Sequence, residues 1–282
     1  MAGALPVACL NGEFLPLSEA RVSPLDRAFL FGDAVYEVVP FFNGRPLQTE
    51  AHLARLRASL DAVGIQVGLT NDDFRTLIGE LAQRNGGGNL VVYLQISRGT
   101  DLERAHVAAR ELQPTVFAMA SAIPAWKPSP GITAITCPDT RWARCDIKST
   151  ALLANVMQLA EARRQDADEA LMLRDGELTE GTTTSVLIVE AGRLIRRPNS
   201  TAILPGTTID LIADLAAQAG IEVTGEAISE SRLRAADEIW ITSAGRGVQP
   251  VVRLDGQAVG DGQPGAFYNQ VAARFEAHIN AS

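Results

Sequence analysis

The chain has 282 residues, 46% hydrophobic and 21% charged, which is enough for buried cores and, at the usual domain size, for two domains. Its formal charge is -8, and the chain has no block of basic residues. This argues against nucleic acid or an anionic membrane as partner and favours a small molecule. The opening residues do not resemble an export signal, no apolar run reaches the roughly 18 residues of a membrane span, and the three cysteines form no CxxC pair, so we expect a cytoplasmic protein without a disulfide framework or zinc site.

Short apolar runs separated by Asn-Gly pairs open the chain. Asn11-Gly12 and Asn43-Gly44 each lie between such runs, and both residues of an Asn-Gly pair tolerate the positive φ of a tight hairpin turn. We therefore expect antiparallel strands on both sides of each pair. Leucines at helical spacing then predict one helix after Thr49 and a second before the Gly86–Gly88 break.

The segment LVVYLQIS, a long loop from Arg98 to Glu111, and the segment PTVFAMA complete a first α+β unit. Three prolines between Ile123 and Gly131 resist both helix and sheet, so this stretch is predicted to be a linker. The expected organisation is an N-terminal domain over residues 1–122, a linker over 123–131 and a C-terminal domain over 132–282.

The second half also mixes strands with helices. Hairpin turns are predicted at Asp175-Gly176 and Asp255-Gly256, and helices over about 150–163 and 207–219. The predicted strands are ITAITC, EALML, SVLIVE, RLIRR, EIWITS and VVRL. The fold class expected from the residues is therefore α+β in two domains.

Lys148 is a candidate nucleophile. It lies at the end of a predicted strand and directly before a predicted helix, with apolar residues on one side and small hydroxyls on the other. Partial burial lowers the pKa of an ammonium group and leaves an amine that can attack an aldehyde. A surface lysine that begins a helix is the alternative, but the chain offers only Lys127, in the linker, as another candidate.

Three further segments could bind a cofactor. Glu180 in LTEGTTTS could hold a proton on a pyridine nitrogen, or be an ordinary turn glutamate. Thr207 and Thr208, after Pro205-Gly206, begin a predicted helix whose unpaired N–H groups suit a phosphate, although a capped helix without ligand would look the same. Arg55 is a second phosphate candidate, with a solvated helix arginine as the alternative.

The long polar loop carries a candidate substrate site. Arg104 and His106 could together hold an anionic group, because arginine binds carboxylates bidentately and imidazole can donate beside it. A solvated loop is the alternative. His52 and His278 fall on predicted helix faces and need no role, and histidines so scattered predict no metal site.

Seven motifs in order resemble those of fold-type IV pyridoxal-phosphate transaminases, most closely the D-amino-acid transaminases. The resemblance covers nearly the whole chain, and the order and spacing make it specific although each motif alone is weak. The motifs are FGDAVYEVV, HLARLRAS, SRGTDLERAH, RWARCDIKS, LTEGTTTS, ILPGTT and EIWITSAG.

The resemblance assigns roles by position. It implies pyridoxal 5'-phosphate as cofactor, Lys148 as its Schiff-base lysine and proton shuttle, and Glu180 as partner of the pyridine nitrogen. It also implies a smaller N-terminal domain and a larger C-terminal domain with a mixed, barrel-like sheet. The remaining positions match a phosphate cup of Arg55, Thr207, Thr208, Ser243 and Ala244, a ring contact at Leu204, and a carboxylate trap of Tyr36, Arg104 and His106.

The implied activity is ping-pong transfer of an amino group from a D-amino acid, such as D-alanine, to 2-oxoglutarate. Because the family's Arg104–His106 loop is contributed by the neighbouring subunit, the resemblance also implies a homodimer. The same fold could instead carry a branched-chain L-amino-acid transaminase, an (R)-amine transaminase, an aminodeoxychorismate lyase or a cofactor-binding protein without catalysis. The Arg-Ala-His triplet argues against the three enzymes, and the pairing of Lys148 with Glu180 argues against the last.

The chain departs from the family at four places. The family's serine-rich stretch after the glutamate is Thr182-Thr183-Thr184-Ser185 here, and Ala244 stands where a threonine contacts the phosphate. The segment between Arg98 and Arg104 is one residue longer, and Val107-Ala108 replaces an aromatic-proline pair. We therefore expect one phosphate hydrogen bond to be absent.

Overall fold

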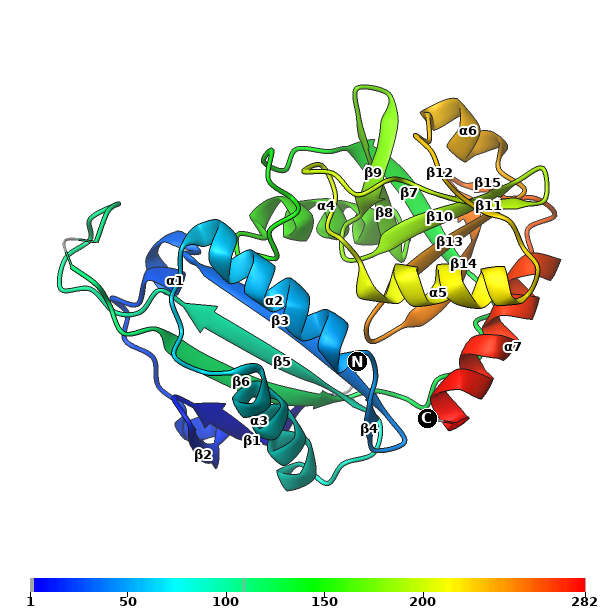
Figure 1. Cartoon of the computed structure of the whole chain (residues 1–282). Helices are drawn as coiled ribbons and strands as arrows, with labels where there is room; N and C mark the ends of the chain where they lie inside the picture. Colours follow the sequence, from blue (N-terminus) through cyan, green and yellow to red (C-terminus); the bar gives the residue numbers. More distant parts are fainter. Residues whose placement is uncertain (1–2, 109, 282) are drawn as a thin grey trace. The chain divides into compact units, whose positions relative to one another are not determined.

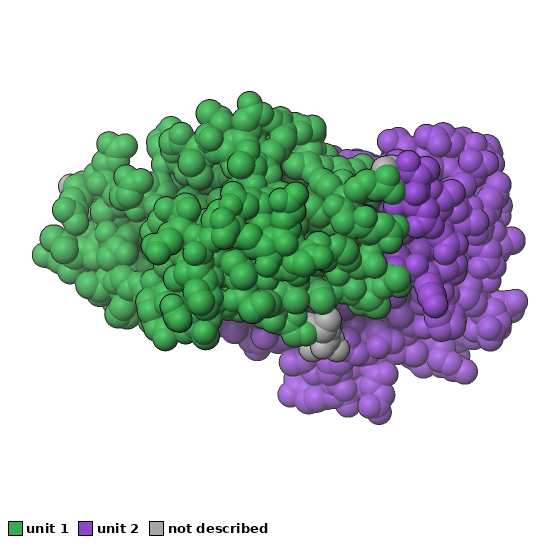
Figure 2. All heavy atoms as spheres, turned by 90° about the horizontal axis from the view of Figure 1, so that it is seen from below, with its two compact units in different colours: residues 1–125, 147–151 green, residues 126–146, 152–282 purple. Residues whose placement is uncertain are grey.

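The chain folds into two compact units in a computed structural model that describes residues 3–108 and 110–281. Unit 1 comprises residues 1–125 together with Ile147–Ala151, and unit 2 comprises Trp126–Asp146 and Leu152–Ser282; Figure 2 colours them separately. Each unit is described below by itself. No helix among the described residues is long and apolar enough to cross a membrane.

Unit 1 is a six-stranded sheet with two helices across one face (Figure 1). The strand order is β2-β1-β6-β5-β3-β4, and every pairing in this sheet is antiparallel. Its elements are β1 (Ala4–Leu10), β2 (Glu13–Pro16), η1 (Leu17–Glu19), α1 (Arg27–Phe31), β3 (Ala34–Phe42), β4 (Arg45–Pro46), α2 (Thr49–Val63), α3 (Asn71–Arg84), β5 (Leu90–Ser97) and β6 (Thr115–Ala122).

The core of unit 1 lies between the sheet and the helices α2 and α3. Apolar residues at helical spacing on both helices are buried against alternate residues of the central strands, which is the pattern a half-covered sheet requires. The residues at its centre are Val35, Val39, Leu53, Leu56, Leu60, Phe74, Ile78, Leu81, Val92 and Leu94. The apolar spacing that predicted the two helices therefore marks their buried faces.

The hairpin predictions are confirmed. Asn11 and Gly12 have φ of 51° and 87°, Asn43 and Gly44 have 52° and 81°, and both pairs connect antiparallel strands. Asp175-Gly176 and Asp255-Gly256 behave in the same way in unit 2. A fifth turn, Ala191-Gly192, was not predicted, because alanine rarely adopts the φ of 51° observed there.

Unit 2 contains a nine-stranded sheet with parallel and antiparallel pairings. The order is β12-β11-β10-β13-β14-β7-β8-β9, with β15 beside β14. The edge strand β9 nevertheless contacts β10, because Gly181 and Thr184 are joined across a short turn, so the sheet curls back on itself. The predicted α+β class with a mixed, barrel-like sheet is confirmed.

The strands and helices of unit 2 follow the predicted segments in most places. The exceptions are the short strands β9, β12 and β15, the short helix α6 and the C-terminal α7, which were not among the predicted segments. Its elements are β7 (Ile132–Pro138), α4 (Leu153–Arg164), β8 (Glu169–Arg174), β9 (Glu177–Gly181), β10 (Ser185–Glu190), β11 (Arg193–Arg196), α5 (Thr207–Gln218), β12 (Val223–Gly225), α6 (Glu230–Ala235), β13 (Glu238–Ser243), β14 (Gly247–Leu254), β15 (Gln257–Ala258) and α7 (Ala266–Ala281).

The segment that carries Lys148 differs from the prediction in two respects. No regular strand precedes the lysine, and the helix that follows begins only at Leu153. Ile147–Ala151 also packs in unit 1, although the predicted boundary at residue 122 would place it in the second domain. The physical reason is that this segment pairs with the backbone of β3. The N–H of Tyr36 donates to the Lys148 carbonyl at 2.9 Å, and Ser149 forms a β-bridge with Val35.

Candidate active site

Lys148 is fixed in unit 1 through its backbone. Its carbonyl accepts from the N–H of Tyr36, and its own N–H donates to the hydroxyl of Ser59 at 3.1 Å. Its side chain is half-buried, and Nζ lies 4.2 Å from the centre of the Tyr36 ring. Tyr36 in turn stacks on Tyr93 at 5.4 Å. Two predicted site residues, Lys148 and Tyr36, are therefore brought together.

A buried ionic cluster lies beside them on β3 and α2. Glu37 accepts from Nε of Arg55 at 2.7 Å and from Nη2 at 2.9 Å, and His52 Nδ1 lies 2.9 Å from the same carboxylate. Burial alone would raise the pKa of Glu37, but the charge and hydrogen bonds of Arg55, with His52 and Lys148, lower it to about 2. Burial lowers the pKa of His52, so the imidazole donates to Glu37 as a neutral ring.

This cluster corrects two expectations from sequence. Arg55 is not a solvated helix arginine, since its side chain is only 11% exposed and grips Glu37. His52, for which no role was predicted, is buried against the same carboxylate. Glu37 was missed altogether, and the available signal was a lone acid inside the apolar run AVYEVVPFF. An acid there must find a buried partner.

Arg104 and His106 lie on an irregular segment that joins β5 to β6 and projects beyond the end of the sheet (Figure 1). Both side chains are exposed, and both contact the ring of Phe31: the Arg104 guanidinium at 5.1 Å and the His106 imidazole at 5.6 Å between centres. A cavity of about 420 Å³ opens beside this loop, lined in part by Arg27, Asp33 and Arg98. The loop thus presents a cation and an imidazole side by side.

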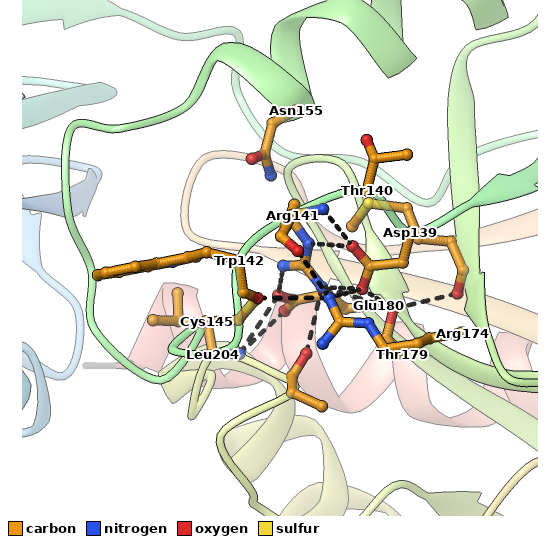
Figure 3. Close-up of polar contacts among 12 residues, drawn as sticks. Asp139, Thr140, Arg141, Trp142, Cys145, Asn155, Arg174, Thr179, Glu180 and Leu204 are labelled. Carbon is orange, nitrogen blue, oxygen red and sulfur yellow. Dashed lines mark hydrogen bonds and ion pairs between the residues drawn. The ribbon is translucent and has the colours of Figure 1, made fainter.

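Glu180 lies in β9 of unit 2, within a strand rather than between two (Figure 3). Arg141 makes a close ion pair with it, and the N–H of Leu204 donates to its two oxygens at 3.3 and 3.2 Å. The carboxylate is 9% exposed. The predicted pair Glu180 and Leu204 is therefore brought together, with Arg141 as an unpredicted third member.

Arg141 bridges two carboxylates. Its Nη2 lies 2.8 Å from Asp139, whose side chain is fully buried, while Nη1 faces Glu180 (Figure 3). Burial would raise the pKa of Asp139, but Arg141 and the Thr179 hydroxyl lower it to about 2. Burial would likewise lower the pKa of Arg141, yet the two carboxylates raise it. Glu180 is thereby held in one orientation beside a fixed positive charge.

The hydroxyls that follow Glu180 bind another buried carboxylate. Glu169 on β8 is fully buried and accepts from the Thr182 N–H at 3.1 Å and from the hydroxyls of Thr183 and Thr184 at 3.2 and 3.1 Å. These threonines therefore hold a turn around a buried carboxylate. They fix the backbone immediately after Glu180.

The start of α5 brings several polar groups together in unit 2. Gly206 precedes the helix without a side-chain cap, and Thr207 and Thr208 are both buried. A Cβ on Gly206 would lie 2.6 Å from the Ser185 hydroxyl, so only glycine lets the helix start approach β10 so closely. Thr242 pairs with Ser185 across the sheet, and its hydroxyl is buried with no hydrogen-bond partner in the described structure.

The predicted phosphate residues are therefore partly assembled. Ser243 ends β13 directly after Thr242, and Ala244 follows in a turn, so both lie at the strand end that adjoins Ser185. Arg55 belongs to unit 1 and the others to unit 2. Among the residues that the structure describes, no group of three or more His, Cys, Asp or Glu side chains could hold a metal ion.

Comparison with known proteins identifies relatives over the full length. A family model described as "Amino-transferase class IV" matches residues 34–254. D-alanine aminotransferase from Bacillus licheniformis is 36% identical over 274 residues, covering 95% of each chain, and that from Staphylococcus haemolyticus is 32% identical, covering 96% of this chain and 97% of the relative.

Solved structures share the fold. The branched-chain amino acid aminotransferase of Escherichia coli superposes with a TM-score of 0.90 at 24% identity, covering 97% of this chain and 94% of that one. The Thermobaculum terrenum enzyme, in its PLP form, gives 0.88 at 21% identity and covers 99% and 95%. At these identities the likeness establishes the fold alone.

Proposed function

Because the chain belongs to the class IV aminotransferases, we propose that it transfers the amino group of D-amino acids, such as D-alanine, to 2-oxoglutarate. The observation that carries this proposal is the Arg104–His106 loop in a chain 36% identical, over nearly its full length, to a D-alanine aminotransferase. A guanidinium beside an imidazole suits an α-carboxylate. The proposed order is ping-pong, with the two substrates taken in turn.

The family uses pyridoxal 5'-phosphate, and the residues present fit it. The uncapped helix start at Gly206, the buried Thr207 and Thr208, and the unpartnered hydroxyl of Thr242 form a donor set suited to a phosphate. Ala244 supplies no hydroxyl to that set. We propose that Arg55 and Ser243 complete it, that Lys148 holds the cofactor covalently through Nζ, and that Leu204 contacts its ring.

The bound cofactor would supply an electron sink for the charge that develops at the substrate Cα. Lys148 would move the proton at Cα, since its backbone is fixed by β3 and its amine is half-buried against Tyr36. Glu180 would hold the proton on the ring nitrogen, because Arg141 and the Leu204 N–H restrict its carboxylate to one orientation. Tyr36, Arg104 and His106 would hold the substrate carboxylate.

We further propose a homodimer in which the Arg104–His106 loop serves the neighbouring subunit. Within unit 1, these two side chains contact Phe31, while Lys148 contacts Tyr36. Large apolar side chains around the loop are exposed: Phe29 to 76%, Leu102 to 74% and Val107 to 82%. Such a concentration on the outside of a folded chain favours a partner surface. A second copy would cover it and receive the loop.

The preference for one enantiomer of alanine tests the proposed function. The rate of the first half-reaction, monitored by absorbance after mixing with D-alanine or L-alanine, should be much faster for the D-enantiomer. Arg104→Ala should raise KM for D-alanine by about tenfold or more, because a charge-assisted hydrogen bond contributes roughly 1.5 to 3 kcal/mol. Faster reaction with L-alanine, or with L-leucine, would instead favour a branched-chain L-transaminase on this fold.

Covalent attachment is tested separately. Borohydride reduction of the loaded protein, followed by peptide mapping, should place the cofactor on Lys148. Label on Lys127 would contradict the assignment. Lys148→Ala should lose the covalent attachment and nearly all turnover.

A further inference from the structure

The Arg104–His106 loop has a closed base. Ser97 and Thr115 are paired at the ends of β5 and β6, so the segment between them leaves and re-enters the sheet at neighbouring points. Just inside that base, Gly99 has φ of 110°, and a Cβ there would lie 2.0 Å from the Gln113 carbonyl oxygen. The two arms of the loop therefore touch at a position where only glycine fits. A long loop with a closed base still requires contacts farther out to hold its tip.

One buried side chain supplies such contacts. Arg27, at the start of α1, donates from Nη1 to the carbonyl of Ala105 and from Nη2 to the carbonyl of His106, both at 2.7 Å. Its Nε donates to Asp33 at 2.8 Å, and the side chain is only 5% exposed. The guanidinium fork thus grips the backbone at the residues immediately after Arg104.

The ring of Phe31, one helical turn later, supports the side chains of the same triplet. The Arg27 guanidinium lies 4.9 Å from its centre, the Arg104 guanidinium 5.1 Å and the His106 ring 5.6 Å. Two residues of α1 therefore position the Arg104–His106 triplet: Arg27 binds its backbone, and Phe31 contacts its side chains. The helix itself is anchored by buried Asp26, which accepts from the Ala28 N–H and from the hydroxyls of Ser97 and Thr115.

We infer that Arg27 is a positioning residue for the substrate carboxylate, acting through the backbone of Ala105 and His106, with Phe31 as the platform for the two side chains. The inference rests on the proposed role of Arg104 and His106 as the carboxylate trap. An exposed pair of polar side chains binds an anion well only when its geometry is fixed in advance. Arg27, a buried side chain, fixes this geometry through its hydrogen bonds to the loop backbone.

The chain offers a matched control in Arg98. Arg98 also binds Asp33, at 2.8 Å from Nε and 3.0 Å from Nη2, and its other hydrogen bonds go to the carbonyls of Val63 and Gly64 at the end of α2. Arg27→Met and Arg98→Met therefore each remove a guanidinium from Asp33. Only the first removes the hydrogen bonds to the carbonyls of Ala105 and His106, beside Arg104. Arg27→Lys is a second variant, which keeps a positive charge near Asp33 but cannot donate in a fork to both carbonyls.

Two measurements decide the inference. In the protein without cofactor, amide hydrogen exchange over residues 102–108 should accelerate by about tenfold in Arg27→Met and in Arg27→Lys, and should stay near the parent rate in Arg98→Met. In the loaded enzyme, both Arg27 variants should raise KM for D-alanine by about tenfold while kcat and the Kd for pyridoxal phosphate change little.

Parallel assay of Arg104→Ala separates the two possible failures. If Arg104→Ala leaves KM unchanged, the proposed carboxylate trap is wrong, whatever the Arg27 variants do. If Arg104→Ala raises KM but the Arg27 variants exchange and bind like Arg98→Met, the trap stands and the positioning role of Arg27 is overturned. If Arg27→Met does not fold, Arg27→Lys carries the same comparison.

Discussion

At the scale of single residues, each unit buries carboxylates whose charge is balanced by an arginine. Arg55 in unit 1 and Arg141 in unit 2 are each buried against acidic side chains, Glu37 in the first case and both Asp139 and Glu180 in the second. Removing one member of a buried ion pair is costly, because the remaining charge loses its partner without regaining water. Two predictions follow from this cost.

Arg141→Met should lower the free energy of unfolding of the cofactor-free protein by about 3 to 5 kcal/mol. Adding Asp139→Asn should recover part of the loss, because without Arg141 the buried Asp139 keeps only the partly exposed Arg174, at 3.0 Å, as an ion-pair partner. Arg144→Met is the control, because its pair with Asp146 is solvent-exposed and contributes little to stability. Urea unfolding measures all four proteins, and equal losses for Arg141→Met and Arg144→Met would contradict the prediction.

Glu37→Gln should change the pH dependence of stability. The folded pKa of about 2 lies below the ordinary 4.5, so ionised Glu37 stabilises unit 1 fully above about pH 4.5, and that contribution is lost as the pH falls toward 2. The variant should lose about 3 kcal/mol at neutral pH and should lack this part of the acid dependence. Urea unfolding between pH 2 and 7 tests it. A parallel pH profile in parent and variant would show that Glu37 is not the group responsible.

At the scale of elements, short irregular segments place the candidate residues, and regular strands and helices support them. Lys148 lies in a segment without strand or helix, Arg104 and His106 lie in a loop, and the helix start at Gly206 creates the proposed phosphate site. The helix start is constrained by its neighbours, because a side chain on Gly206 would collide with Ser185 and Ile209.

Gly206→Ala should weaken binding of pyridoxal phosphate by about tenfold or more, since displacing the helix start misdirects its N–H groups. Absorbance titration of the cofactor-free protein measures the Kd. The matched control is Gly79→Ala in α3, where a Cβ meets nothing within 4 Å. That substitution should stabilise the helix by up to about 1 kcal/mol and leave the Kd unchanged. Unaltered binding in Gly206→Ala would remove α5 from the phosphate site.

The sequence predicted most of the long elements, with the C-terminal α7 as the exception, and missed short ones for a physical reason. Periodic burial marks α2, α3 and α5, and Asn-Gly pairs mark the hairpins, because these signals are local. The five-residue α1 has no such period. It is stabilised by Asp26, whose partners Ser97 and Thr115 lie about 70 and 90 residues away in the chain. Likewise, Lys148, Glu180 and Arg104 could be selected from sequence, and Glu37 carried the signal of a lone acid in an apolar run. Arg141 and Arg27 are distinguished only by partners that folding brings to them.

At the scale of the whole molecule, the proposed dimer links the exposed apolar surface of unit 1 to activity. Phe29→Asp should dissociate the dimer in sedimentation experiments and abolish turnover at the same protein concentration, because each site would lose its partner's loop. Gln83→Asp places the same charge on an exposed position of α3 and should change neither property. A parent protein that is monomeric and fully active would contradict the proposal.

Residues Ile147–Ala151 belong to unit 1 although the chain on both sides of them belongs to unit 2. This arrangement limits how related genes could exchange their parts. A single crossover in the proline-rich linker would join an N-terminal unit from one parent to a Lys148 segment from the other. The hydrogen bond between Tyr36 and the Lys148 backbone would then form between residues of different parents. Chimaeras that also exchange residues 147–151 should retain more stability than single-crossover ones. Unit 1 is thus built from two separate segments of the chain, and the shorter segment carries Lys148.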